Sequence, residues 1–450
     1  MEKWAAKELS QADLGDARRN KRLIRIVEDL ATQPASSVPQ ACGNIAATSA
    51  AYDFWKSPYF QPSDIRKAHT ASTIERIKEH QEILAIQDTT NIDLTDHPAT
   101  RGIGYLDNRK SSGLKVHSTL AATSNGVPLG IIDQQVWVRE PENLGIAKKR
   151  RQRETQEKES QRWLDGLEIT QKLIPANIQV VTVADSEADI FDLFNQKRPE
   201  NSHLLIRGTH NRKVDHCAKY LHLAIRQIPP GGQLTVEVKR SPESRARKAI
   251  LTLRFTSFDI LVPLHHIGRS RLKPVKLQVI LASEENPPSG IQPISWLLMT
   301  SLEINRLEEA ARCVRWYTYR WLIERYHYAL KSGCKIEKLQ LETARRIEMA
   351  LATYTIVAWR LLWLTYEARC NPMQPCETVL ETYEWQSLCA TIHKNPIPPT
   401  QPPCLREAVR MIAMLGGFLG RKSDGEPGIQ TIWRGLRRLH DIAATWKLLH

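Results

Sequence analysis

The chain has 450 residues, 42% of them hydrophobic, which is enough for two or three domains with cores of their own. Its 63 Lys and Arg residues outnumber its 49 Asp and Glu residues, and the formal net charge of +14 favours a polyanionic partner, most commonly nucleic acid, over a merely basic soluble protein. No apolar run reaches the roughly 18 residues of a membrane span, and the first residues carry no apolar signal segment, so we expect a cytoplasmic protein with no membrane partner. The eight cysteines form no Cys-x-x-Cys pair, which argues against a zinc site.

Residues 1–70 have the pattern of a helical and basic N-terminal domain. Arg18, Arg19 and Arg22 fall within about one and a half helical turns. Apolar positions over 23–30 follow at helical spacing. Such a cationic helix is either a solvated face or a surface that lies on DNA.

An α/β pattern follows these helices. Two short apolar runs end in an aspartate, Asp88 and Asp185, as buried strands do where polar groups gather at their carboxyl ends. A basic run at 148–153 is expected to be a loop near DNA. The expected strands are 83–90, 115–123, 127–138, 178–185 and 203–207, with helices at 154–173 and 187–196.

A β-rich segment at about 211–300 separates these strands from the helical remainder of the chain. It has the pattern of an inserted subdomain, and a Pro-rich linker precedes a last helical unit at 405–450. The strands expected within the segment are 233–239, 249–255, 260–264, 275–282 and 296–300.

The stretch 317–331 is the most informative part of the chain. On one continuous α-helix, Tyr317, Arg320, Glu324 and Lys331 point at about 0°, 300°, 340° and 320°, so they share a narrow stripe. A carboxylate ringed by a phenol, a guanidinium and an ammonium suits a metal ion held beside a phosphate backbone. The alternative is an ordinary exposed helix on which Arg320 and Glu324 form an i,i+4 ion pair.

Three carboxylates occupy comparable positions, Asp88 and Asp185 at strand ends and Glu324 on a helix. Three hard oxygen ligands with open positions suit Mg²⁺ or Mn²⁺. Two such ions about 3.5–4 Å apart activate a water or a 3′-hydroxyl and stabilise the leaving oxygen. Taken singly, Asp88 could start a turn and Asp185 could cap the next helix. Their occurrence together, on this order of elements, favours a metal site.

These motifs resemble those of the bacterial cut-and-paste DDE transposases of the IS-four group. The Tyr-x-x-Arg-x-x-x-Glu-x6-Lys signature is intact over 317–331, and the Asp-Thr-Thr that follows the first strand stands at 88–90. The second Asp motif reads Asp-Ser-Glu-Ala-Asp at 185–189. Ser186 stands where the family usually has arginine, which leaves the expected metal ligand Asp185 in place. The resemblance runs almost from end to end.

The resemblance implies an α/β fold with an RNase H-like catalytic core. This core would span 71–370 and carry the β-rich insertion at about 211–300. A helical DNA-end-binding domain at 1–70 and a helical dimerisation region at 371–450 would flank it.

The resemblance also implies contacts to DNA. Phosphate groups of the DNA beside the cut would be bound by Tyr317, Arg320 and Lys331. Trp296 would receive a base flipped out of the duplex, and stacking on it would return about 1–3 kcal/mol of the unstacking cost. A core tryptophan on a strand is the alternative for Trp296. The other implied DNA contacts are Arg18, Arg19 and Arg22 near the N-terminus and Arg207, Arg212 and Lys213 in the core.

The function implied is that of a bacterial, nucleoid-associated transposase. Such an enzyme binds terminal inverted repeats as a homodimer and uses Mg²⁺ or Mn²⁺, two ions per site, to excise its element, with a DNA hairpin as intermediate. It then joins the freed ends to target DNA. The alternatives are a catalytically silent, transposase-derived DNA-binding protein or inhibitor, and a host nuclease. The intact carboxylates and N-terminal helix argue against the first, and the near full-length resemblance argues against the second.

Overall fold

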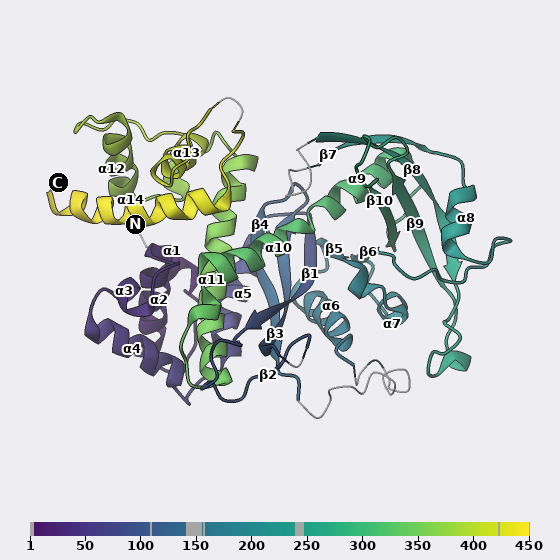
Figure 1. Ribbon diagram of the computed structural model, residues 1–450, viewed down its shortest axis with the longest axis horizontal. Helices are drawn as coiled ribbons and strands as arrows, with labels where there is room; N and C mark the ends of the chain where they lie inside the picture. Colours follow the sequence, from purple (N-terminus) through teal and green to yellow (C-terminus); the bar gives the residue numbers. More distant parts are fainter. Residues whose placement is uncertain are drawn as a thin grey trace.

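A mixed β-sheet runs through the molecule and helices pack against it, so the fold is mixed α/β (Figure 1). The computed structural model describes residues 4–108, 110–140, 155, 158–238, 247–421 and 424–449. The basic run expected to be a loop at 148–153 lies outside these residues.

The described part of the sheet has ten strands in the order β2-β3-β1-β5-β6-β10-β9-β8-β7, with β4 paired to β3. The β1–β5 and β5–β6 pairs are parallel, and the other pairs are antiparallel. Parallel strands buried on both faces need mostly apolar side chains, which explains the apolar run at the start of β1 and the apolar residues of β5, interrupted only by Thr182. The strands are β1 (Glu82–Asp93), β2 (Gly104–Tyr105), β3 (Ser112–Thr123), β4 (Pro128–Trp137), β5 (Gln179–Ala184), β6 (Ser202–Arg207), β7 (Gly232–Val238), β8 (Arg247–Ile260), β9 (Val275–Ser283) and β10 (Ser295–Thr300).

The β-rich segment extends the central sheet instead of forming a sheet of its own. Its last strand, β10, pairs with β6, and β9, β8 and β7 follow outward from there. The separate strand expected at 260–264 is wrong. Ile260 is the last residue of β8, because the antiparallel pairing of β8 with β9 continues without a break as far as Ile260 opposite Val275.

The helix expected at 187–196 is confirmed only in its second half. The chain forms a short 3₁₀ turn, η4 (Ser186–Ala188), and then α7 (Phe191–Asn195). Between them the carboxylate of Asp189 accepts hydrogen bonds from the backbone N–H groups of Thr209 and His210, each at 2.8 Å. These tertiary bonds hold Asp189 outside a helical conformation. The neighbouring helices are α6 (Gln161–Leu173) and α8 (Leu221–Gln227).

The N-terminal helices pack on the C-terminal half of the chain. Asp16 caps α2 by accepting from the N–H of Arg18, and the apolar side of α2 packs on the long helix α11. Glu8, on α1, is buried and bonds to His69 and Arg76 of α5, which fastens the first helix to the core. The helices are α1 (Trp4–Glu8), α2 (Ala17–Thr32), α3 (Val38–Cys42), α4 (Ile45–Lys56) and α5 (Pro62–Ile77).

The C-terminal helices lie beside the N-terminal ones, at the left of Figure 1. Helix α14 packs on α12, α13, α11 and α2. Although no apolar run of span length stands out in the sequence, α11 is long and apolar enough for a membrane span. However, 83% of its most apolar window is buried in the fold, as in a core helix of a soluble protein. The helices are α9 (Leu307–Thr318), α10 (Trp321–Tyr328), α11 (Ala344–Cys370), α12 (Thr382–His393), α13 (Leu405–Leu415) and α14 (Ile429–Leu449).

Candidate active site

Strands β1 and β5 place two aspartates next to each other. The strands are parallel, and Ile86 lies opposite Val183. Two residues further along each chain, the same register puts Asp88 beside Asp185, where β5 has just ended. Asp185 therefore lies at the carboxyl end of β5, where functional groups gather in α/β sheets. The expectation that Asp88 also ends a strand is wrong, because β1 continues to Asp93 through its antiparallel pairing with β3.

The surroundings of Asp88 oppose its ionisation. Burial, and next the charge of Asp185, raise the pKa of Asp88 to about 7. The charge of Glu324 acts in the same direction, whereas the N–H of Thr89, 2.9 Å from Oδ1, and the guanidinium of Arg320 oppose the shift. The three carboxylates therefore interact through space, and positive charge placed among them would be stabilised.

Asp185 caps the turn that follows it. Its Oδ1 accepts a hydrogen bond from the backbone N–H of Glu187 at 2.9 Å, so the capping interpretation of this residue holds. A carboxylate has about four lone-pair sites, so this bond leaves others able to bind a cation. Capping and ligation are compatible at Asp185.

The expectation of one continuous helix through 317–331 is wrong. Helix α9 ends at Thr318, α10 begins at Trp321, and a π-helical turn, η6 (Ala329–Gly333), follows. The N–H groups of Tyr319 and Arg320 bond to carbonyls three residues back, which tightens the chain between α9 and α10. Angles of about 100° per residue therefore do not carry across the stretch.

Arg320 and Glu324 still meet after this break. Nη2 of Arg320 lies 2.5 Å from Oε1 of Glu324. The Arg320 side chain is buried, whereas that of Glu324 is about one-third exposed. An ordinary solvated ion pair would expose both partners, so this pair belongs to the wall of the site.

His327 is a residue that the sequence analysis missed. It is buried on α10, one turn after Glu324, and its Nδ1 lies 3.7 Å from Oδ2 of Asp88. Burial lowers the pKa of His327 to about 3, so the ring is neutral. The signal available in the sequence was its i+3 spacing from Glu324 on one helix face.

The donor chemistry of the site fits a hard cation, because it offers carboxylate oxygens from three elements. Within the described ranges, however, no three His, Cys, Asp or Glu side chains are close enough to hold a metal ion as they stand. The ion pair with Arg320 engages Oε1 of Glu324, which leaves other lone pairs of this carboxylate for a cation shared with the aspartates.

Tyr317, Trp296 and Arg207 form a second group beside the carboxylates. The rings of Trp296 and Tyr317 meet edge to face with centroids 5.4 Å apart. Burial raises the pKa of Tyr317, and the charges of Arg320 and Arg207 oppose this shift. Arg207 lies opposite Leu298 in the β6–β10 pair. Trp296 is half-buried, so one part of its side chain packs on Tyr317 while another stays accessible, and its role as a base receptor stays a prediction.

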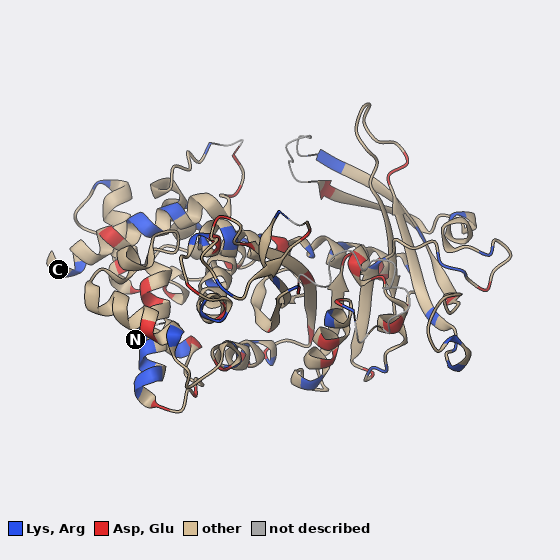
Figure 2. Ribbon diagram, turned by 60° about the horizontal axis from the view of Figure 1, so that its bottom comes forward, with Lys and Arg blue, Asp and Glu red and all other residues tan. Residues whose placement is uncertain are grey.

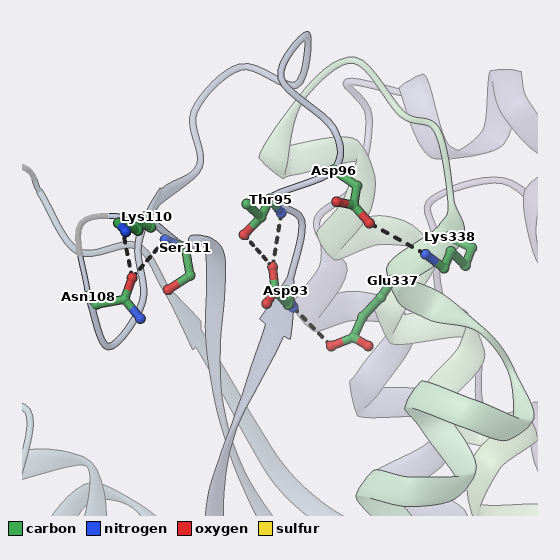
Figure 3. A pocket seen from close by; sticks show the side chains of 8 residues that line it. All are labelled: Asp93, Thr95, Asp96, Asn108, Lys110, Ser111, Glu337 and Lys338. Atoms are coloured by element: carbon green, nitrogen blue, oxygen red, sulfur yellow. Dashed lines mark hydrogen bonds and ion pairs between the residues drawn. The ribbon is translucent and has the colours of Figure 1, made fainter.

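Lys331 lies on the π-helical turn and pairs with Glu337, Nζ to Oε1, at 3.2 Å. Glu337 also accepts from the N–H of Asp93 and borders a polar pocket of about 600 Å³ (Figure 3). Asp96 and Lys338 also line this pocket, and Oδ2 of Asp96 lies 3.6 Å from Nζ of Lys338 (Figure 3). The pocket lies beyond the end of β1, and none of the three candidate catalytic carboxylates lines it.

Arg212 has a role within the fold, and its expected contact with DNA stays a prediction. This side chain is buried, and its Nε lies 2.8 Å from Oδ1 of Asp189, which is fully buried. Its guanidinium thus holds the loop that follows β6 and does not face a ligand. Lys213, the next residue, is exposed.

Cations follow one another on α2 beside the N-terminus, where Figure 2 shows a run of Lys and Arg segments. Arg18 is 91% exposed and pairs with Asp16. Arg22 is exposed, whereas Arg19 donates to the carbonyl of Leu14 and lies over the ring of Tyr59. Arg18 and Arg22 are therefore the more accessible to DNA.

Three family models match the chain. A transposase DNA-binding family matches residues 1–59, a transposase DDE domain matches 147–360, and the transposase Tn5 dimerisation domain matches 356–445. The DDE match contains Asp185 and Glu324 and begins after Asp88. In this order along one chain with a mixed α/β fold, the three matches support a DDE transposase that has its own DNA-binding and dimerisation domains.

Proposed function

We propose that this chain is an active cut-and-paste transposase of the IS-four group. It would bind the terminal inverted repeats of its element, excise the element through a hairpin intermediate and join it to target DNA. The observation that carries the proposal is the interaction of the charges of Asp185 and Glu324 with the partly buried Asp88, which raises its pKa. The protein would act as a dimer on bacterial DNA in the cytoplasm.

Asp88, Asp185 and Glu324 would hold Mg²⁺ or Mn²⁺, two ions per site. Bound there, the metal would supply an activated water or 3′-hydroxyl and positive charge for the leaving oxygen. The residues around it would position the DNA. Arg320 would exchange part of its contact with Glu324 for a phosphate, which planar guanidinium groups bind through paired hydrogen bonds.

The remaining contacts would orient the transposon end. Arg207, Tyr317 and Lys331 would bind phosphate near the cut, and Trp296 would stack on an extruded base. Residues 1–70 would bind the terminal repeat, and the exposed Arg18 and Arg22 would contact its phosphates. Residues 71–370 would form the catalytic core, and 371–450 would join two subunits.

A catalytically silent DNA-binding derivative is the second candidate. Two observations favour it: Glu324 is ion-paired with Arg320, and no ready-made metal group exists among the described side chains. This candidate keeps end binding and loses cleavage.

The decisive experiment uses duplexes that carry the inverted repeats flanking the coding region. We expect Mg²⁺-dependent cleavage by the wild-type chain. Asp88→Asn, Asp185→Asn and Glu324→Gln should each abolish cleavage and keep end binding in a gel-shift assay, because removal of a metal ligand costs rate more than ground-state binding. Asp96→Asn, an exposed carboxylate beyond the site, is the control. End binding without cleavage by the wild type would leave only the silent derivative.

A further inference from the structure

His327 lies next to the carboxylate of Asp88, and among the described residues no second carboxylate contacts its ring. It lies 5% exposed on α10, which packs against β1. Its Nδ1 is 3.7 Å from Oδ2 of Asp88. The other oxygen, Oδ1, already accepts from the N–H of Thr89 at 2.9 Å.

The second ring nitrogen of His327 gives an independent observation. Nε2 is buried and has no hydrogen-bond partner among the described residues. A histidine retained only for packing would leave a polar atom unsatisfied at a cost of about 1–3 kcal/mol, which an apolar side chain of similar size would avoid. The role of the imidazole therefore lies in Nδ1, the ring nitrogen that faces Asp88.

The two faces of β1 use different histidines. Thr89 and Gln87, which flank Asp88, face α6, and there His117 contacts both of them, with its Nδ1 2.9 Å from Oγ1 of Thr89. Alternate side chains of a strand point to opposite faces, so Asp88 faces α10 and His327. His117 is thus a buried histidine next to the same strand that does not touch Asp88.

We propose that His327 is a positioning residue that fixes the carboxylate of Asp88 for metal binding. Its Nδ1–H donates to Oδ2 of Asp88, a contact that needs the two atoms to close from 3.7 Å to about 3 Å. Oδ2 is then held from the side of α10, while Thr89 holds Oδ1. The inference rests on the proposed function, since it assigns a partner to one of the proposed metal ligands. Outer partners of this kind typically change metal affinity by about 10–100-fold.

The test compares side chains that keep or lose a donor at the Nδ1 position. His327→Asn places an amide N–H where Nδ1 stands, His327→Gln places it near Nε2, and His327→Leu fills the space with no donor. Mn²⁺ binding to the full-length protein on a terminal-repeat duplex is measured by electron paramagnetic resonance. First-strand cleavage is titrated with Mg²⁺, and end binding and thermal unfolding are recorded for each variant.

We expect His327→Leu and His327→Gln to weaken Mn²⁺ binding about 10–100-fold and to raise the half-maximal Mg²⁺ concentration in parallel, with end binding unchanged. His327→Asn should stay within about threefold of the wild type. His117→Asn is the matched control, and it should lower thermal stability without moving the Mn²⁺ affinity.

Two results would overturn the proposal. One is equal Mn²⁺ affinity in the wild type and in a folded His327→Leu protein. The other is a loss in His327→Asn as large as that in His327→Gln, which would mean that the ring acts only by its shape. If His327→Leu does not fold, the Asn and Gln pair still decides. Failure of the wild type to bind Mn²⁺ and to cleave would instead contradict the proposed function and, with it, this inference.

Discussion

Nη2 of Arg320 lies 2.5 Å from Oε1 of Glu324, and the arginine is the more buried partner. The guanidinium also interacts with Asp88, whose pKa it lowers against the larger effects of burial and of Asp185. Arg320 is thus a cation inside an acidic site, and not half of a solvated surface pair. This position suits a residue that meets a phosphate once DNA is bound.

Arg320 and Lys331 should each contribute to the salt dependence of end binding. Each phosphate contact adds a slope of about −0.9 in a plot of log K against log salt for duplex DNA. Arg320→Gln and Lys331→Gln should therefore each make the slope shallower by about one. Fluorescence anisotropy over roughly 50 to 300 mM salt measures the slope. Arg325→Gln, an exposed cation on α10, is the control. An unchanged slope in both site variants would mean that the two cations only hold Glu324 and Glu337.

Asp88→Asn should stabilise the protein in EDTA at pH 8. The folded-state pKa of Asp88, about 7, exceeds its usual value of 3.8, so ionisation costs the folded state stability. That cost is absent below about pH 4, grows as the pH rises toward 7, and is complete above it. Since one pKa unit corresponds to about 1.4 kcal/mol, the variant should gain up to about 4 kcal/mol at pH 8 and little near pH 4.

Urea unfolding at several pH values measures this gain. Asp96→Asn removes a carboxylate that pairs with Lys338 on the surface, and it should change the free energy of unfolding by less than about 1 kcal/mol. A loss of stability in Asp88→Asn at pH 8 would show that the carboxylate is held by favourable contacts.

The neighbouring positions of Asp88 and Asp185 could be predicted from the sequence because each aspartate follows an apolar run, and the run is a local pattern. The continuation of β1 to Asp93 could not, since it depends on pairing with β3. The break before Arg320 could not, since Tyr, Arg and Trp all tolerate a helix and the break depends on the packing of Arg320 into the site. Similarly, Asp189 leaves its expected helix for backbone groups about 20 residues away. The pairing of β10 with β6 is equally non-local, so the sequence predicts the strands of the insertion but not their continuity with the core sheet.

Substitutions of Arg212 and Lys213 should have separate effects, the first on stability and the second on DNA binding. Arg212→Ala leaves the buried carboxylate of Asp189 without its cation, which typically costs about 3–5 kcal/mol. Lys213→Ala should leave the melting temperature unchanged and weaken DNA binding by the loss of one phosphate contact. Calorimetry and gel shifts on the same preparations measure both. A stable Arg212→Ala protein with weakened DNA binding would restore the DNA-contact interpretation.

Trp296→Ala should impair hairpin formation far more than first-strand nicking. If Trp296 receives an extruded base, loss of stacking removes about 1–3 kcal/mol, or roughly 5- to 150-fold in the hairpin step. An abasic nucleotide at the flipped position should restore part of the rate, because extrusion then costs less. Denaturing gels resolve the two products, and Trp296→Phe, which keeps a stacking ring, is the control. Equal loss of nicking and hairpin, with a lower melting temperature, would favour the core tryptophan that packs on Tyr317.

Met414 and Leu419 are the exposed apolar side chains at the end of α13, 45% and 66% exposed, and they lie within the dimerisation match. Met411 and Leu415 of the same segment are buried, so they support the fold and not a partner. Removal of α13 and α14 would uncover α11 and α2, on which they pack, so substitution is a cleaner test than truncation.

The double variant Met414→Glu with Leu419→Glu should bind single ends normally and fail to pair them, because two charges on each copy would have to be buried in a symmetric interface. Light scattering of complexes with terminal-repeat duplexes measures the loss of pairing. Leu448→Glu, at the exposed end of α14, is the control. Full cleavage of both ends by a monomeric double variant would contradict a dimeric requirement at this surface.

A mixture of two defective subunits tests whether each subunit cuts the end held by the other. Paired ends need two active sites, so a Glu324→Gln subunit should recover cleavage when it is mixed with a subunit defective in end binding through Arg18 and Arg22. No recovery would mean that each subunit cuts the end that it binds itself.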